Sequence, residues 1–384
     1  MSATLLSARE VLLRAREVLE PAGVAYKCAA SLGALGIINS GLPSYSQAGK
    51  FITVYCSDAD QAVGLAAELD AATFGLAGPE VPYDLPFRTG GLVFYRYGSF
   101  AGTTIRDPRG RWRPDRREAG GAVPSWVANP FPQVAPGADD DGPIGLRFLV
   151  TQALAQRGKG GVYEALDLDA QPARLCILKE GRRHGETQWD GSDGFRRVGH
   201  EATALRDLLR RGVPVPQVLG EFEQGGNRYV ALEKLDGEPL VRRRGHRTNR
   251  RPWPLVGRIS REIVKLLQQI HDAGWVWRDC KPDNLLLGQD RIRPIDFEGA
   301  CRIDETSVIP WGSIAYTPRH ILAGNGRQAG WQEDDFAAAV ATFQLGTGVV
   351  PSPSKTDWAS HLLKARCPAR LRDQLLSVLT PTPS

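Results

Sequence analysis

Hydrophobic positions in the first hundred residues follow helical spacing in some stretches and strand-like spacing in others. Leucine and valine residues from Leu5 to Leu19 recur at helical intervals, in a stripe that ends before Pro21. Residues 51–55 and 92–95 are rich in β-branched and aromatic side chains, which predicts strands, whereas residues 59–72 have a helical pattern. The N-terminal third is therefore predicted to be a mixed α+β domain.

The pattern changes after residue 146. Strands are predicted at 148–153, 174–178 and 229–232, with a glycine-containing turn between the first two, and a helix at 200–211. Apolar residues then recur at helical spacing from Val256 to Ile270, until Gly274. Pro, Gly and three consecutive Asp lie between the two parts. We therefore expect domains at 1–135 and 146–384, joined by a linker at 136–145.

Composition and charge narrow the class of protein. A hydrophobic content of 42% and a charged content of 24% are typical of a folded chain. The longest apolar stretch, residues 336–350, is too short to cross a bilayer and is expected to be a buried helix. Charged residues interrupt every apolar run near the N-terminus, so we expect a cytoplasmic protein without a membrane partner. The net charge of +5 is too mild to indicate nucleic acid.

The strongest chemical signal is the run WRDCKPDN at residues 277–284, followed twelve residues later by Asp296. At this spacing Asp279 is a candidate base for a hydroxyl proton, and Lys281 a cation for a transferring phosphoryl group. Asn284 and Asp296 offer oxygen ligands for Mg²⁺. The arrangement is that of a protein-kinase catalytic loop. It predicts a two-lobed kinase-like domain, an enzyme of the Ser/Thr-kinase-like phosphotransferase type, with ATP and Mg²⁺ as cofactors.

Residues upstream fit the same order. Lys179 ends an apolar strand and is assigned to the α- and β-phosphates, and Glu201, 22 residues later, is expected to pair with it. The remaining ATP-binding candidates are the turn glycines, the valine that would cover the adenine, and two residues after the strand 229–232: Gly158, Gly160, Gly161, Val162, Glu233 and Leu235.

Some positions depart from the kinase pattern. Trp277 replaces the usual histidine before Arg-Asp, and Glu298 stands where Asp-Phe is usually followed by glycine. Only about 50 residues follow Asp334 and Asp335, one of which is expected to anchor the next helix. We therefore expect a shortened C-terminal lobe.

The chain resembles the class III and class IV lanthionine synthetases, which phosphorylate Ser and Thr of a ribosomal precursor peptide and then eliminate the phosphate. The strings that carry the resemblance are GKFITVY at 49–55, YRYGSF at 95–100, NPF at 129–131, GGVY at 160–163 and KEGR at 179–182. The resemblance implies an N-terminal phosphothreonine-lyase-like α+β domain followed by the kinase. We expect the family's third domain, a zinc-dependent cyclase, to have no counterpart in this sequence, because no zinc-ligand cluster precedes Ser384.

For the lyase-like domain the resemblance assigns possible site residues Lys27, Lys50 and Arg96. The family's histidine is Ala29 here, and all six histidines lie at His184 or beyond. Without a general acid such catalysis loses about 10²–10⁴ in rate. We therefore expect the lyase activity to be weak or lost and the domain to be degenerate.

The sequence is compatible with three functions. The leading hypothesis is an ATP- and magnesium-dependent kinase that phosphorylates Ser or Thr of a precursor peptide in lanthipeptide-like natural-product maturation, with a separate cyclase or lyase protein as a further partner. A second is a phosphotransferase for a small natural product, whose acidic substrate the arginine-rich residues 242–251 would steer. A third is a non-catalytic nucleotide- or peptide-binding scaffold.

Overall fold

The structure is a computed structural model that describes residues 1–99, 103–115, 123–131, 142–241, 250–289, 291–305, 311–318, 321, 330–352 and 356–380. Contacts between residues divide the chain into two compact units. The first comprises Met1–Gly199 and Glu221–Ala231, and the second His200–Gly220 and Leu232–Ser384. Helices and strands are mixed in both, which confirms the predicted α+β class. The expected linker at 136–145 lies mostly outside the described residues, and those domain limits stay a prediction.

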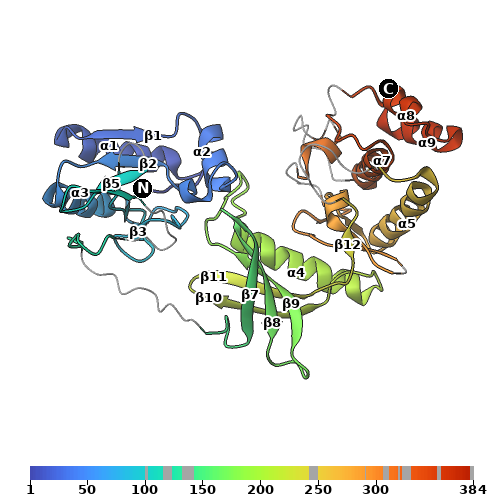
Figure 1. The fold of residues 1–384 in the computed structure, drawn as a ribbon, viewed down its shortest axis with the longest axis horizontal. Coiled ribbons are helices and arrows are strands. Elements are labelled where there is room, and N and C mark those ends of the chain that lie inside the picture. The colour runs from blue at the N-terminus through green and yellow to red at the C-terminus, as the bar shows by residue number, and fades with distance from the viewer. Residues whose placement is uncertain are drawn as a thin grey trace. The chain divides into compact units, whose positions relative to one another are not determined.

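The N-terminal part of the first unit is built from short helices and strands (Figure 1). Its elements are α1 (Ala8–Ala22), β1 (Ala25–Cys28), α2 (Leu32–Ser40), η1 (Tyr45–Gln47), β2 (Ile52–Tyr55), α3 (Ala59–Ala72), β3 (Leu85–Pro86), β4 (Phe94–Tyr95), β5 (Thr104–Arg106) and β6 (Trp112–Pro114). The strands form three antiparallel pairs, β1–β2, β3–β4 and β5–β6.

Apolar side chains from separate segments share one core in this part. Val11 and Leu19 of α1, Ile52 of β2 and Leu69 of α3 are all at most 3% exposed. Helices α1 and α3 pack against each other. Val11 and Leu19 of the predicted stripe are therefore buried, whereas Leu6 and Leu13 of the same stripe are exposed.

The rest of the first unit centres on a five-stranded sheet. Its strands are β7 (Phe148–Arg157), β8 (Gly160–Asp167), β9 (Arg174–Gly181), β10 (Val218–Gln224) and β11 (Asn227–Glu233), in the order β10-β11-β9-β8-β7. The chain then enters α4 (Gly194–Arg210), whose first residues belong to this unit and whose remainder belongs to the second.

The second unit is mainly helical (Figure 1). It contains α5 (Trp253–Asp272), α7 (Trp331–Thr347), α8 (Trp358–Lys364) and α9 (Ala369–Leu379), with the short elements β12 (Glu238–Pro239), β13 (Trp275–Val276), η2 (Pro282–Asn284), β14 (Leu285–Leu287), β15 (Ile292–Pro294), β16 (Cys301–Arg302) and η3 (Ile314–Tyr316). Helices α5 and α7 pack together, and most of α7 is buried. A buried helix was predicted at 336–350, but the helix begins at Trp331 and ends at Thr347, and Val350 is exposed. Strands β13 and β16 pair in antiparallel fashion.

Several predicted boundaries were wrong. Helix α1 continues through Pro21 to Ala22, because the chain reverses only at Gly23, which has the left-handed φ of 61° that suits glycine. Strand β7 extends four residues beyond Ala153, and α4 begins six residues before His200. The end of β7 is largely exposed, so its residues carry no hydrophobic alternation for the sequence to reveal.

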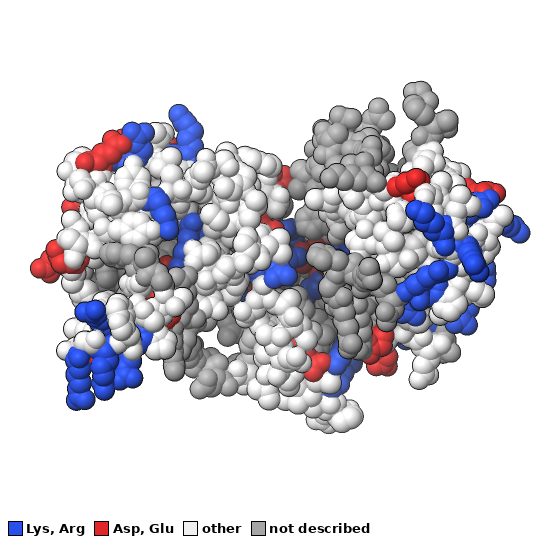
Figure 2. All heavy atoms as spheres, turned by 45° about the horizontal axis from the view of Figure 1, so that its top comes forward, with Lys and Arg blue, Asp and Glu red and all other residues white. Residues whose placement is uncertain are grey.

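The described residues show two further features. No helix among the described residues has the length and apolar character needed to span a membrane. On the face drawn in Figure 2, the described Lys and Arg side chains gather in separate clusters on a surface that is mostly uncharged.

Candidate active site

The loop that carries Asp279 is held in place by helix α7. Both carboxylate oxygens of Asp334 accept backbone N–H bonds, from Trp277 at 2.8 Å and from Arg278 at 2.7 Å. His271 lies 2.9 Å from the same carboxylate, which is 0% exposed. Arg278 has a φ of 68°, a conformation that is strained for a residue with a side chain. Asp334 is thus the anchor expected among the two neighbouring aspartates.

The carboxylate of Asp279 is buried at the centre of a polar group. It accepts hydrogen bonds from Lys281 Nζ at 2.6 Å and from Asn284 Nδ2 at 2.8 Å. Ser313, which the sequence did not single out, lies 3.3 Å from its second oxygen and 3.1 Å from Lys281 Nζ. Burial raises the pKa of Asp279 above its ordinary value, although Lys281 partly offsets that effect. Three predicted residues therefore converge here.

Trp277 helps to hold Asp296 in position. The indole Nε1 donates a hydrogen bond to the backbone carbonyl of Asp296 at 2.9 Å, and the indole ring stacks on Phe297 with centroids 5.3 Å apart. Asp296 has a φ of 69°, so its backbone also needs support from its surroundings. The tryptophan that departs from the usual kinase pattern is thus a buried donor that holds the metal-ligand candidate.

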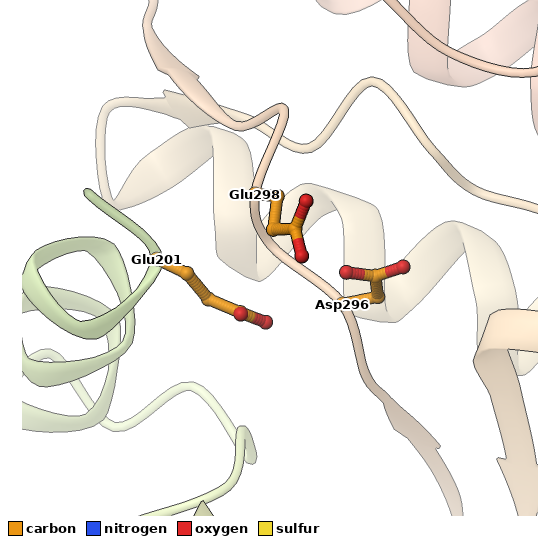
Figure 3. A group of neighbouring side chains, drawn as sticks. All are labelled: Glu201, Asp296 and Glu298. Atoms are coloured by element: carbon orange, nitrogen blue, oxygen red, sulfur yellow. The ribbon is translucent and has the colours of Figure 1, made fainter. Parts of the chain in front are cut away.

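Three carboxylates converge beside this point. Glu201 of α4, Asp296 and Glu298 each bring an oxygen to a common place, where these atoms lie within 4.8 Å of one another (Figure 3). Glu201 also accepts the N–H of Phe297 at 2.9 Å. Like charges this close repel, and oxygen-rich sets of this kind suit a hard divalent cation. The residues therefore fit Mg²⁺, and Glu298 is a candidate ligand that the sequence had marked only as a departure.

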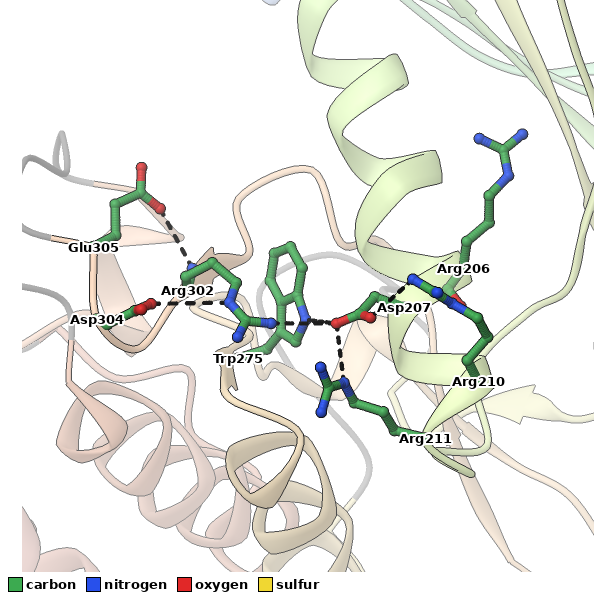
Figure 4. Close-up of polar contacts among 8 residues, drawn as sticks. All are labelled: Arg206, Asp207, Arg210, Arg211, Trp275, Arg302, Asp304 and Glu305. Atoms are coloured by element: carbon green, nitrogen blue, oxygen red, sulfur yellow. Dashed lines mark hydrogen bonds and ion pairs between the residues drawn. The ribbon is translucent and has the colours of Figure 1, made fainter.

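The far end of α4 is fixed by a second polar network. Asp207 accepts hydrogen bonds from Trp275 Nε1 at 2.9 Å, from Arg302 at 3.2 Å and from Arg211 at 3.1 Å (Figure 4). These bonds lower the pKa of Asp207 below its ordinary value, the one from Trp275 most. The helix that supplies Glu201 is therefore tied to β13 and β16, the strands that flank the catalytic segment.

The first unit carries Lys179 and the glycines of the turn. Lys179 is 8% exposed and is the register partner of Val162 on the neighbouring strand, so both side chains lie on one face of the sheet. Gly160 has a φ of 149°, and a Cβ added there would lie 1.8 Å from the carbonyl oxygen of Glu180. Close backbone packing therefore requires this glycine. The assignment to ATP and the pairing of Lys179 with Glu201 stay predictions.

The other candidate nucleotide-binding residues lie near the ends of strands, and their roles stay predictions. Glu233 ends β11, where its N–H bonds the carbonyl of Gln217 at 2.8 Å, and Leu235 is buried. Gly158 and Gly161 are also buried in the turn region. Residues 242–249 of the arginine-rich stretch lie outside the described residues.

The three candidates of the lyase-like domain each make a separate contact. Lys27 is exposed on β1, with its ammonium 5.5 Å from the centre of the Tyr55 ring. Lys50 pairs with Asp84 at 2.8 Å, and Arg96 makes two bonds to Asp115, at 3.1 and 3.0 Å.

The pocket described in this domain, about 620 Å³, is lined in part by Asp115 and by arginines 109, 111 and 113 of the β5–β6 hairpin. Lys27, Lys50 and Arg96 are not among its lining residues. Two of the three cations are therefore neutralised by carboxylates, and the lyase assignment stays a prediction.

Comparison with known proteins agrees with the two-part organisation. Residues 1–142 match the family described as RamC, N-terminal domain, and residues 156–376 match the protein kinase domain. The chain is similar to the probable SapB synthase of Streptomyces coelicolor, with 30% identity over 79% of this chain and 35% of the relative. The predicted resemblance to lanthionine synthetases is thereby confirmed.

Bacterial protein kinases are also similar. Serine/threonine-protein kinase F of Synechocystis is 27% identical over 62% of this chain and 52% of its own length. Serine/threonine-protein kinase PknL of Mycobacterium tuberculosis is 29% identical over 53% of this chain and 50% of its own. The chain thus spans between about a third and a half of the length of these relatives. The predicted class, a Ser/Thr-kinase-like phosphotransferase, is confirmed at the level of family.

Proposed function

We propose, from the premise that this chain belongs to the protein kinase family, that it transfers the γ-phosphoryl group of ATP to Ser or Thr hydroxyls of a ribosomally made precursor peptide. The observation that carries the proposal is the convergence of Asp279, Lys281 and Asn284 next to the segment that bears Asp296. Each chemical task in phosphoryl transfer can then be assigned to one of these residues.

The acceptor hydroxyl would be activated by Asp279. Its carboxylate is buried, and burial raises its pKa, which makes it a stronger base than an exposed aspartate. Asn284 and Lys281 fix one of its oxygens, so the carboxylate is oriented before a substrate arrives. The ammonium of Lys281 lies where it can also offset negative charge on a transferring group.

A divalent cation fits the neighbouring oxygen set. Asn284 uses its Nδ2 toward Asp279, and its amide oxygen remains a ligand of the kind that Mg²⁺ accepts. Asp296 and Glu298 supply carboxylates. When bound, Mg²⁺ with ATP would supply the phosphoryl group with its oxygens partly neutralised. Lys179 would hold the other phosphates.

The peptide substrate is proposed from the N-terminal domain and the likeness to the SapB synthase, whose name describes the making of a product rather than signalling. We further propose that elimination of phosphate is weak or lost in this chain, since Lys50 and Arg96 are each bound to a carboxylate. A separate cyclase or lyase protein would then complete the maturation. The proposed setting is the cytoplasm, with no nucleic-acid partner.

The test is mass spectrometry of short peptides from neighbouring reading frames after incubation with the chain, ATP and Mg²⁺. A gain of phosphate supports the proposal, whereas phosphate found only on a small molecule contradicts the peptide substrate. We expect Asp279→Asn to lower the rate by about 10²–10⁴ while ATP still binds. Asp283→Asn, in the same segment, is the matched control. Equal rates in the two variants would remove Asp279 from the role of base.

A further inference from the structure

The glycine turn of the sheet is in direct contact with the N-terminal domain. The N–H of Gly158, at the tip of the β7–β8 hairpin, donates a hydrogen bond to the carbonyl of Ser40, the last residue of α2, at 3.0 Å. Both residues belong to the same compact unit, and both are buried. A Cβ added to Gly158 would lie 1.6 Å from the carbonyl oxygen of Asn39. Glycine is therefore required here because another protein segment sits on the turn.

The opposite side of the turn is closed as well. The carbonyl of Lys159 accepts the N–H of Arg182 at 2.8 Å, and a Cβ added to Gly194 would lie 1.8 Å from that same carbonyl oxygen. The turn is thus packed between the end of α2 and the connection from β9 to α4. A turn fixed on both sides has little freedom to move as a separate flap.

A second contact reaches the strand that carries Lys179. The hydroxyl of Tyr45, in η1, accepts a hydrogen bond from the guanidinium of Arg182, which also lies over the Tyr45 ring. Arg182 makes two bonds of 3.0 Å to Glu180, the residue next to Lys179. Glu180 in turn accepts a hydrogen bond from Tyr163 of β8 at 2.9 Å. The contact from the N-terminal domain therefore continues into β9 and its neighbour.

We propose that the segment 39–45 of the N-terminal domain positions the nucleotide-binding strand and turn of the kinase, with Ser40 and Tyr45 as its positioning residues. The inference rests on the proposed function in assigning the turn and Lys179 to ATP. Ser40 holds the turn through a backbone carbonyl, which no side-chain substitution removes. Tyr45 holds the end of β9 through its hydroxyl, which a single substitution does remove.

The test uses Tyr45→Phe in the full chain. Loss of one hydrogen bond between domains is expected to weaken binding of a non-hydrolysable ATP analogue with Mg²⁺ by about 2- to 10-fold. Amide hydrogen exchange of residues 157–161 is expected to rise in the same variant. Tyr95→Phe is the matched control, because the Tyr95 hydroxyl accepts a bond from Asn129 inside the N-terminal domain. That control is expected to leave both measurements unchanged.

A second variant tests the turn itself. In Gly158→Ala the added methyl group would meet the carbonyl of Asn39, so exchange should rise in α2 and η1 as well as in the turn. Exchange that stays as in the wild type in both variants would overturn the proposal. Tighter analogue binding in Tyr45→Phe would overturn it too. That result would mean that loosening the segment frees the Gly158 amide for phosphate, so that the N-terminal domain competes with the nucleotide for this amide. If the wild type binds no analogue, the proposed function fails, while the exchange data still decide whether the segment holds the turn.

Discussion

Replacing Asp334 by asparagine tests whether helix α7 holds the catalytic loop. The carboxylate is 0% exposed and accepts the backbone N–H groups of Trp277 and Arg278, one on each oxygen. An amide of the same shape keeps one acceptor oxygen and turns an NH₂ group toward the other donor. The substitution therefore removes a charge-assisted hydrogen bond and leaves a buried N–H facing a second donor.

The expected loss follows from these two effects. A hydrogen bond to a charged group contributes ~1.5–3 kcal/mol, and a buried donor left without an acceptor costs ~1–3 kcal/mol. We expect a decrease of about 3 kcal/mol in the free energy of unfolding, which corresponds to a fall in Tm of roughly 6–12 °C for a unit of this size. The strained backbone of Arg278, at φ 68°, would no longer be held and would relax. Asp279, the next residue, would then move from its place.

Two measurements check the reasoning. Thermal unfolding gives the change in stability, and amide hydrogen exchange of residues 275–281 reports the opening of the loop directly, because two of the affected groups are its own N–H groups. A loss of about 3 kcal/mol corresponds to roughly 100-fold faster exchange. Asp335→Asn is the control, since Asp335 is the next residue on α7 and makes none of these bonds. If both variants melt within 2 °C of each other (about 1 kcal/mol or less) and exchange alike, Asp334 does not hold the loop.

Three further predictions concern other residues. Trp277→Phe keeps a stacked ring but loses the bond to the carbonyl of Asp296 and leaves space in the core, so ATP turnover should fall about 10-fold or more and Tm should also fall; an unchanged rate would contradict that role. Glu298→Gln removes one carboxylate from the cation cluster, so the Mg²⁺ concentration for half-maximal ATP turnover should rise several-fold, and an identical Mg²⁺ titration would exclude Glu298 as a ligand. Hydrogen bonds from Arg111 lower the pKa of Asp107 to about 2, and the bond from the backbone N–H has the largest effect. The stability that the ionised Asp107 carboxylate contributes to the fold is therefore complete above pH 4 and is lost as the pH falls toward 2. Asp107→Asn should flatten this pH dependence in thermal unfolding curves.

Local sequence predicted some elements well and others poorly, for physical reasons. The helix at Ala59–Ala72 was placed with correct limits, since Asp58 caps its start and its apolar positions recur regularly. Strand β1 was not predicted, because three of its four residues are exposed and only pairing with β2 defines it. Tertiary pairing decides such strands, and a single sequence does not contain it.

The candidate active site likewise contains residues that local sequence predicted and one that it did not. Asp279, Lys281 and Asn284 lie within six residues, so their spacing alone predicted that they would meet. The place of Glu298 beside Glu201 depends on a contact between segments almost a hundred residues apart. No local pattern carries that information, although the unusual Glu298 marked the position.

The contact between α2 and the β7–β8 turn limits how this architecture can be rearranged in evolution. Gly158 leaves room for the carbonyl of Asn39, and Arg182 meets the hydroxyl of Tyr45, so the two halves are matched at named positions. Recombination that joined this N-terminal half to a kinase with a bulkier turn would create a steric clash. Lineages that exchange such modules must therefore inherit both sides of the junction together.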